Sequence, residues 1–271
     1  MKDDLVDQLM GEAIRKMGGS EDAPSATPEA APAATCAKSP AACNLTEFIG
    51  SAVGNIIGMV IANVDPLLHE QMKLDKKYRS IGIVGARTGT DPHIFAVDEA
   101  VKATNSTVLV IELPRDIEGG TGHGSLIIFG AADISDARSA VKVMLGELDR
   151  TFGDVYGNQA DHLEFQYTAR ASYALNKAFE APIGQAFGIT VGAPAGIGVM
   201  LADTAAKAAT IEAVGYSSPG NGGTSFSNEV IFTFSGDSGA VPQAIHAARD
   251  VGKQLLGSMG EPPVSTTTPY I

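Results

Sequence analysis

The chain has 271 residues, of which 44% are hydrophobic, and its 31 acidic and 19 basic side chains give a formal net charge of −12 at pH 7. This charge argues against nucleic acid and against an anionic membrane surface as partners, because both demand basic patches. The two cysteines, Cys36 and Cys43, have no histidine close by, so we predict reduced thiols rather than a disulfide framework or a zinc site. No run approaches the roughly 18 apolar residues of a membrane span, and we expect a cytoplasmic protein.

The first 44 residues are expected to form an amphipathic helix followed by a disordered linker rich in Ala and Pro. Within residues 3–17, apolar side chains such as Leu5, Leu9 and Ile14 follow the spacing of one helical face. Residues 20–43 contain too few large apolar side chains to offset the entropy of ordering. Such a helix either docks on its own domain or binds another protein in a groove, and the sequence leaves both open.

From residue 45 the sequence is typical of a folded domain. The expected elements, in order, are a strand near 58–63, a charged helical segment at 67–77, a strand at 79–85, a helix to about 105, a strand at 107–113, a glycine-rich loop, a strand at 125–129 and a helix to about 152. Asp91 is predicted to cap the first long helix, with Pro92 at its first position, and Asp133 to cap the second.

The same order of landmarks then recurs. The matched pairs and their separations are Gly82 and Gly188 (106 residues), Lys102 and Lys207 (105), Gly119 and Gly222 (103), and Asp133 and Asp237 (104). A strand at 163–171 precedes the second copy as the one near 58–63 precedes the first. So constant a separation indicates two copies of one domain of about a hundred residues, a usual domain length. We assign them to residues 45–157 and 158–271, the second with a C-terminal tail, and expect Asp237 to open the last helix.

The glycine-rich loop, Gly119-Gly120-Thr121-Gly122-His123-Gly124-Ser125, returns altered in the second copy. Its lack of side-chain bulk suits a phosphate cradle, a strained catalytic turn, or a place where several chains converge. A nucleotide-binding enzyme therefore remains an alternative, although residues 82–89 do not match the dinucleotide fingerprint. Asp116 and Glu118, just before the loop, either form a general-base pair or line the solvated mouth of a pore.

Residues 236–239, Gly-Asp-Ser-Gly, match the nucleophile sequence of trypsin-like proteases, but a helix begins at once and the first copy has a plain helix cap there. Ser238 is therefore not expected to be catalytic. The histidines His93, His123, His162 and His246 show no ligand spacing. We predict no catalytic residue, no metal and no cofactor.

Several stretches resemble the bacterial microcompartment shell proteins. The strand–helix–strand order of residues 187–189, 203–209, 213–216 and 230–241 is similar to the single module of that family. Two modules, each with the closing strand moved to its front, resemble the tandem, circularly permuted class. Residues 45–48, 170–175, 224–229, 236–241 and the terminal Pro269-Tyr270-Ile271 are similar to the tandem shell proteins of propanediol-utilisation compartments. The resemblance implies an α/β (α+β) fold of two tandem permuted modules, each a small antiparallel ferredoxin-like sheet flanked by helices.

The resemblance further implies a homotrimer whose six modules form a pseudohexagonal tile, in lateral contact with other shell proteins. Small polar metabolites would pass the centre, where the two glycine-rich loops meet their copies. The implied pore-lining residues are Gly120, Thr121, Gly122, His123, Gly124, Ser125, Gly223, Thr224, Ser225, Phe226, Ser227 and Asn228. Lys102 and Lys207 fall on the tile-edge lysine of the family, although each also suits a surface pair with the aspartate four residues before it. Leu5, Leu9 and Ile14 would contact luminal core enzymes.

Two other functions stay open at this point. One is a cytosolic α/β enzyme that binds a nucleotide at the glycine-rich loops, and the other is a regulatory trimer that binds a small molecule. The arginine motif of the closing strand in single-module tiles is not evident near residues 61–64, so edge contacts are expected to differ from those of single-module tiles.

Overall fold

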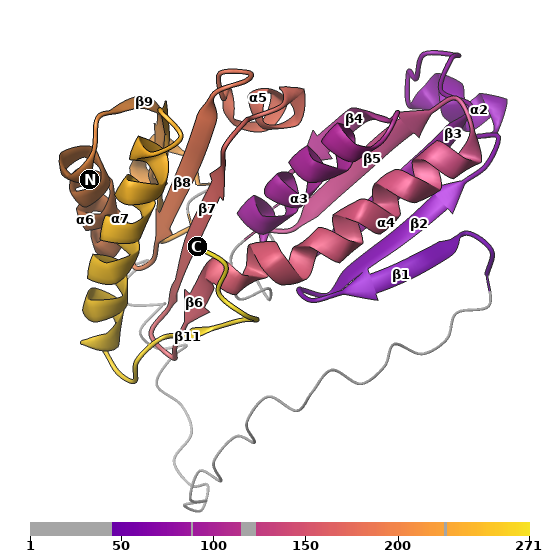
Figure 1. Ribbon diagram of the computed structural model, residues 1–271. Coiled ribbons are helices and arrows are strands. Elements are labelled where there is room, and N and C mark those ends of the chain that lie inside the picture. Colours follow the sequence, from indigo (N-terminus) through magenta and orange to yellow (C-terminus); the bar gives the residue numbers. More distant parts are fainter. Residues whose placement is uncertain (1–44, 88, 115–122, 225–226) are drawn as a thin grey trace, which may run out of the picture. The chain divides into compact units, whose positions relative to one another are not determined.

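The computed structural model describes residues 45–87, 89–114, 123–224 and 227–271 with their side chains (Figure 1). The predicted N-terminal helix with Leu5, Leu9 and Ile14, the two cysteines and the tips of both glycine-rich loops lie outside the described residues. Among the helices that are described, none is long and apolar enough to cross a membrane.

The first module is an antiparallel sheet covered by helices on one face. Its strands are β1 (Phe48–Ala52), β2 (Ile56–Ile61), β3 (Ser80–Ala86), β4 (Thr107–Glu112) and β5 (Ser125–Ala131), in the order β1-β2-β3-β5-β4. Its helices are α2 (Pro66–Gln71), α3 (Thr90–Ala103) and α4 (Ile134–Thr151). The two long helices α3 and α4 lie side by side, and α4 packs on β1, β2 and β3 (Figure 1).

The second module repeats this arrangement. Its strands are β6 (Val155–Gly157), β7 (His162–Thr168), β8 (Ala186–Gly192), β9 (Ile211–Ser217), β10 (Val230–Gly236) and β11 (Val264–Ser265), in the order β11-β6-β7-β8-β10-β9. Its helices are α5 (Tyr173–Phe179), α6 (Ala195–Ala208) and α7 (Ala240–Gly257), with short 3-10 turns at Phe152–Asp154 and Pro219–Asn221. The C-terminal strand β11 extends this sheet beside β6.

The two modules therefore have the same topology, and the predicted α+β tandem fold is confirmed. In each copy a strand, β2 or β7, comes before the strand it pairs with at the centre of the sheet, as expected for a permuted module. β6 pairs with β7 and belongs to the second sheet, although a boundary after residue 157 would assign it to the first module. We propose that the boundary lies before Val155.

Some predicted helix ends were wrong. Helix α3 begins at Thr90 after Gly89, which adopts a left-handed backbone with φ 84°, so Asp91 lies inside the helix and is buried rather than capping it. The last helix, α7, has Gly239 at its N-cap without a side-chain bond, and Asp237 contributes only its backbone carbonyl. The charged segment 67–77 forms only the short helix α2, because the chain turns at Lys73 with φ 54°. By contrast, Asp133 caps α4 as predicted, accepting from Ser135 N and Asp136 N.

In the second module helix α6 approaches strand β8 closely. A Cβ atom on Gly198 of α6 would lie 2.7 Å from the carbonyl oxygen of Gly192 on β8 and 2.8 Å from that of Val230. Backbone atoms cannot move aside as a flexible side chain can, so only glycine fits at this position. The neighbouring Gly196, in the same helix, has nothing within 4 Å of the same atom.

We therefore predict that Gly198→Ala lowers the free energy of unfolding by about 1–3 kcal/mol, because it overpacks the helix against the strand. The matched control Gly196→Ala should leave stability unchanged or raise it by up to about 1 kcal/mol, because alanine favours helix and fills open space. Chemical denaturation of the three proteins measures both values. Equal stability of the two variants would contradict the close approach of α6 and β8.

Candidate functional site

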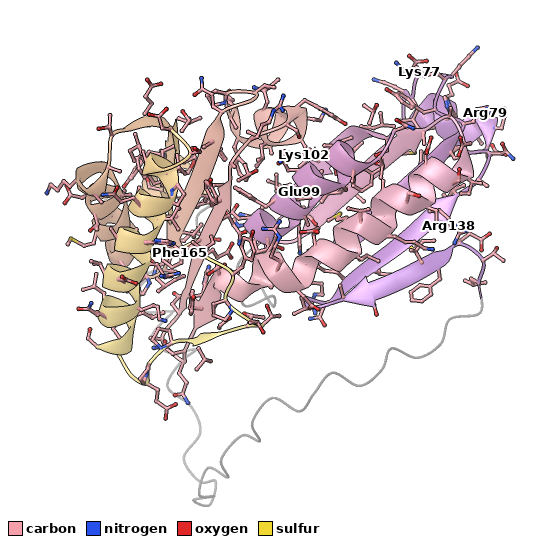
Figure 2. All side chains as sticks on the ribbon, in the orientation of Figure 1. Lys77, Arg79, Glu99, Lys102, Arg138 and Phe165 are labelled. Atoms are coloured by element: carbon pink, nitrogen blue, oxygen red, sulfur yellow. The ribbon has the colours of Figure 1, made fainter. Side chains whose placement is uncertain are left out.

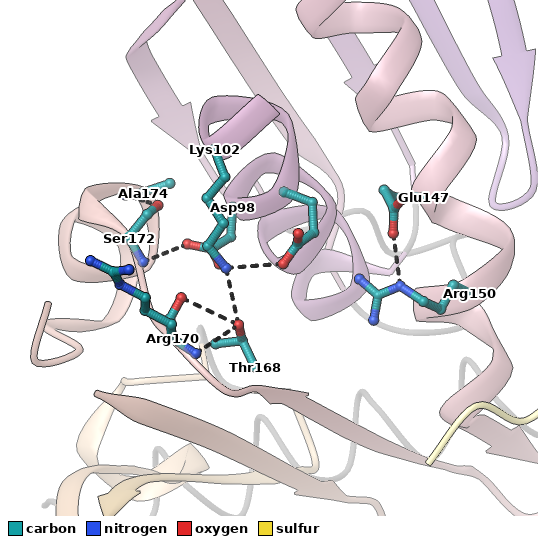
Figure 3. A network of polar contacts seen from close by, with 9 residues as sticks. Asp98, Lys102, Glu147, Arg150, Thr168, Arg170, Ser172 and Ala174 are labelled. Atoms are coloured by element: carbon teal, nitrogen blue, oxygen red, sulfur yellow. Dashed lines mark hydrogen bonds and ion pairs between the residues drawn. The ribbon is translucent and has the colours of Figure 1, made fainter. Parts of the chain in front are cut away.

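The two modules meet along a contact that we call the seam, formed by α3 and β4 of the first module and α5 and β7 of the second. At its polar end the carboxylate of Asp98, whose side chain is fully buried, accepts a hydrogen bond from Ser172 N at 2.8 Å. Lys102 lies 2.5 Å from the other oxygen of Asp98 and donates to Thr168 Oγ1 at 3.1 Å (Figure 3). Each of these two charged groups of the first module thus has a hydrogen-bond partner in the second.

The seam also has an apolar part. The rings of Phe95 on α3 and Phe187 on β8 stack with their centroids 6.2 Å apart, and Phe179 at the end of α5 stacks on Phe187 at 6.3 Å. At the edge strand β4, Val108 N donates to the hydroxyl of Tyr173 at 2.7 Å. The two modules consequently share one apolar cluster, which ties their positions together.

The two predicted edge lysines have different surroundings. Lys102 lies beside Glu99 on α3, on the side facing the second sheet (Figure 2), and its side chain is 29% exposed. Lys207 occupies the same place on α6, but its side chain is 75% exposed and pairs only with Asp203, at 2.7 Å. Each lysine pairs with the aspartate four residues before it, but only the pair with Asp203 lies at the surface as predicted, since Asp98 is buried. The tile-edge role of both lysines stays a prediction.

Below the Asp98 contact, ionisable side chains of both modules gather in a group that we call the seam cluster: Asp91, His123, His162, Glu164 and Glu229, each less than 9% exposed. His123 Nδ1 lies 3.3 Å from Glu229 Oε1, and His162 Nε2 lies 3.5 Å from Glu229 Oε2 and 3.7 Å from Glu164 Oε1. His162 also bonds Asp161 at 2.9 Å through Nδ1. The first module supplies Asp91 and His123, and the second supplies the rest.

Burial and neighbouring charged groups shift the pKa values of the side chains in this cluster. Burial raises the pKa of Asp91 to about 7, and the nearby carboxylate of Glu229 adds to the increase. Burial likewise raises the pKa of Glu164 well above its ordinary value. Burial opposes a charge on His162, but its bonds to Asp161 and Glu229 outweigh this and raise its pKa to about 10. For Glu229 the two histidines outweigh burial and lower its pKa. The cluster therefore favours the charged forms of His162 and Glu229 and the protonated forms of Asp91 and Glu164.

A third buried histidine, His93 of α3, contacts the start of β5. His93 Nδ1 lies 2.8 Å from Ser125 Oγ, and its ring packs against Phe152 with centroids 5.7 Å apart. Burial lowers the pKa of His93 to about 3, so the ring is neutral. This pair fixes the strand that follows the first glycine-rich loop.

Beside the seam lies a half-open cavity of about 380 Å³, which we call the seam cavity. Its described lining combines carboxylates, hydroxyls, one imidazole and an apolar wall. The residues are Thr90, Asp91, Leu113, His123, Glu164, Ala178, Phe179, Glu180, Val191, Val214, Gly215, Ser217, Gly223, Glu229, Ile231 and Thr233. A space of this size lined by convergent polar groups is suited to a small hydrogen-bonding molecule.

The predicted pore-lining residues are only partly described. Gly120, Thr121, Gly122, Ser225 and Phe226 lie outside the described residues. Among the others, His123, Ser125, Thr224 and Ser227 are buried, and the side chains of the first three have partners inside the chain. Ser227 bonds Thr224 through its backbone. Asn228 is exposed, and its side-chain oxygen accepts from Ala195 N at 3.3 Å. Gly124 donates its backbone N–H to Pro114 O, and Gly223 lies at the seam cavity.

Sequence reasoning missed the carboxylates of the seam cluster. It assigned Asp91 to a helix cap and treated His123 and His162 as unrelated, because nothing in the chain order links residues so far apart. One usable signal was Glu164, an acidic residue within a strand whose neighbours on both sides are apolar. Within the described parts of the chain, no group of three or more His, Cys, Asp or Glu side chains is arranged to hold a metal ion.

The raised pKa of Asp91 predicts a pH-dependent stability. The folded protein retains this proton up to a pKa of about 7, whereas an unfolded chain releases it near 3.8, so this group makes the fold less stable as the pH rises between these values. Asp91→Asn removes the penalty, and between pH 5 and pH 8 it should gain about 2–3 kcal/mol relative to the unmodified protein. Denaturant titrations at both pH values measure this. Asp203→Asn, at an exposed carboxylate, serves as control, and parallel curves for all three proteins would contradict the prediction.

Comparison with known proteins identifies the family. The BMC domain model matches residues 186–264. The chain is 58% identical over 269 residues, 99% of its length and 98% of the relative, to the bacterial microcompartment shell protein PduB of Citrobacter freundii, and 57% identical with the same coverage to that of Salmonella typhimurium. A crystal structure of a trimeric bacterial microcompartment shell protein PduB superposes with a TM-score of 0.79 at 49% identity, covering 84% of this chain and all of that one. These relatives are structural proteins rather than enzymes. The chain therefore belongs to the PduB family of bacterial microcompartment shell proteins.

Proposed function

We propose that this protein is a shell tile in which three chains close into a ring of six modules. The observation that carries this proposal concerns the two helices buried at the seam, α3 and α5. Each has a counterpart in the other module, α6 and α2, whose matching surface is exposed. A seam inside one chain is thus a template for the contact between chains. The trimeric PduB structure, to which this chain is similar, supports the same number of copies.

The first uncovered surface is helix α2. It is the counterpart of α5, with Leu67 and Leu68 at the positions of Ala174 and Leu175. Ala174 and Leu175 are fully buried in the seam, whereas Leu67 and Leu68 are 67% and 41% exposed. Exposed neighbouring leucines are expected where a partner covers them.

The second uncovered surface is helix α6, the counterpart of α3. Ile94 and Phe95 of α3 are buried in the seam, whereas Val199 and Met200, 105 residues later, are about half exposed. Asp203, the counterpart of the buried Asp98, is also half exposed. The outer surface of α6 thus has the pattern of α3 without the partner that α3 has.

These two surfaces differ from one another and lie on different modules, so joining them makes a head-to-tail contact. Such a contact either closes into a ring or continues as a filament. If the contact between chains repeats the geometry of the seam, each module is rotated by one sixth of a turn from the one before it. Six modules, and therefore three chains, then close the ring. Lys207 would then meet the partner subunit as Lys102 meets the second module. We retain both lysines as candidates for lateral contacts with other shell proteins.

The remaining parts of the proposal rest on the sequence. The two glycine-rich loops would face their copies at the ring centre, where small residues avoid collision, and would pass small polar metabolites of the diol, aldehyde or alcohol type. The N-terminal helix, through Leu5, Leu9 and Ile14, would attach luminal enzymes at the end of its linker.

The ring predicts that charge on either uncovered surface blocks assembly. Leu68→Glu and Met200→Glu should each weaken trimer formation by more than tenfold, because burying such a side chain contributes about 1.5–3 kcal/mol and a buried unpaired carboxylate reverses it. Sedimentation velocity at several concentrations measures the oligomer.

The control is Ile183→Glu, at an exposed apolar residue whose counterpart in the first module is Lys76, a position that already tolerates charge. Trimers that persist in both the Leu68 and the Met200 variant, or an unmodified protein that stays monomeric at all concentrations, would refute the head-to-tail ring.

Removal of residues 1–37 tests the proposed attachment. The truncated chain should still form trimers and shells, because the uncovered surfaces of α2 and α6 lie beyond residue 44, but the enzyme core should no longer remain with the shell. Fluorescence microscopy of a labelled core enzyme, compared with a Leu5→Glu/Leu9→Glu variant of the full chain, shows whether core and shell separate. A core that stays attached in both cases would mean that the helix has another role.

A further inference from the structure

A segment that we call the latch, residues 264–271, crosses the short connection between α4 and β6. It begins as strand β11, which pairs with β6 (Figure 1). Ser265 Oγ then donates to Gly153 O at 2.6 Å, and Thr266 N donates to Val155 O at 2.9 Å. The latch is thus bonded both to the connection between the modules and to the edge of the second sheet.

The far end of the latch is held by two charged side chains. Asp154, only 2% exposed, accepts hydrogen bonds through Oδ2 from Tyr270 N at 3.1 Å and from Ile271 N at 3.0 Å. Arg249 on α7 donates from Nη1 to Ile271 O. A buried carboxylate requires such donors. Because all three bonds go to backbone atoms, the site recognises the main chain of a peptide rather than particular side chains.

The connection is shaped for this segment. A Cβ atom on Gly153 would overlap the carbonyl oxygen of Thr268, so only glycine leaves room for the latch. The first sheet ends at β1, the counterpart of β6, and among the described residues no strand pairs with the outer edge of β1. The fold of a module therefore does not require an additional strand at this edge, which indicates that the latch has another role.

Apolar burial contributes little to the attachment of the latch. Ile271 packs against the core of the second module, but Val264 and Tyr270 are 72% and 64% exposed. A half-open cavity of about 430 Å³ lies between the latch and the last turn of α4. A segment held mainly by hydrogen bonds near the surface opens at a lower free energy than the core strands. Its opening exposes β6 as an edge strand, to which an extended peptide can pair.

We propose that the latch opens and closes locally, and that the groove beneath it, formed by β6, Asp154 and Arg249, is a peptide-docking site. The ligand is an extended peptide that donates backbone N–H groups to Val155 O and to Asp154 and offers a carbonyl oxygen to Arg249. In the closed state the occupant is the latch of the same chain, because the covalent tether keeps it at an effective concentration of about millimolar. None of the groups that form the groove belongs to the seam cluster or to the predicted pore lining.

Hydrogen exchange of the full-length protein, followed by mass spectrometry, tests the local opening. Amide groups of the latch should exchange at least tenfold faster than those of the central strand β8. Their rate should not change at low denaturant concentration, because a local opening exposes little surface. Latch amides that exchange only as slowly as β8, through global unfolding, would overturn the proposal.

Two variants locate the attachment. Gly153→Ala should raise exchange of the latch about tenfold and leave β8 unchanged, because the added Cβ atom displaces the latch. Gly146→Ala, on α4 with nothing within 4 Å of the same atom, is its control. Arg249→Gln provides a second variant, compared with Arg138→Gln, which removes a similar bond to a backbone carbonyl elsewhere. Exchange of the latch that is unchanged in both Gly153→Ala and Arg249→Gln would refute the attachment.

A peptide added to the protein tests the groove. The variant Thr266→Pro/Tyr270→Pro of the full chain lacks two N–H groups that hold the latch but keeps the groove intact. A fluorescently labelled peptide with the sequence of residues 262–271 should bind this variant saturably at concentrations up to about millimolar, measured by fluorescence anisotropy. The same peptide with both prolines should not bind. Equal binding of the two peptides, or binding of neither, would refute the docking site, whereas trimer formation is measured separately.

Discussion

A buried carboxylate must have partners, and in this protein that requirement joins two domains. Asp98 receives one hydrogen bond from the backbone of the second module and an ion pair from Lys102, which itself reaches Thr168 across the same contact. Loss of either partner would leave the buried charge of Asp98 without compensation. An uncompensated charge is far less favourable in the interior than at the surface. The two modules are therefore held at one relative position, and the other features of the seam, its stacked rings and its cavity, follow from that position.

The two copies of the module have the same topology but not the same chemistry. The seam inside the chain holds Asp91, Glu164 and Glu229, whereas the matching positions in the other copy are Gly196, Ile57 and Gly124. A ring built from such chains would have two kinds of contact that alternate around it, three that hold the carboxylates Asp91, Glu164 and Glu229 and three that lack their counterparts. The tile would then be threefold in its electrostatics even where its backbone is close to sixfold, and pH would act on alternate contacts only.

Much of the fold could be predicted because the chain contains two copies of one module, so that each copy can be aligned with the other. The constant separation of Lys102 from Lys207, and of Asp133 from Asp237, is enough to locate both modules along the chain. Local rules predicted the cap at Asp133 correctly, yet the same rules placed a cap at Asp91, because a sequence does not show whether an aspartate at a helix start faces water or a second domain. The seam cluster could not be predicted for the same reason. His123, His162 and Glu229 come together only after both sheets have formed.

The position of the ionisable cluster has a thermodynamic explanation. Buried charges weaken an interface unless every one is paired, and Asp91 is not fully paired. Between separate chains this would subtract directly from the free energy of association. Between modules of one chain, covalent linkage keeps the partners at an effective concentration of about millimolar or more, so the contact forms despite the same penalty. A polar cavity that is unfavourable for stability is therefore best tolerated at the seam inside the chain, and the contacts that we propose between chains would bury the exposed Leu67, Leu68, Val199 and Met200 instead.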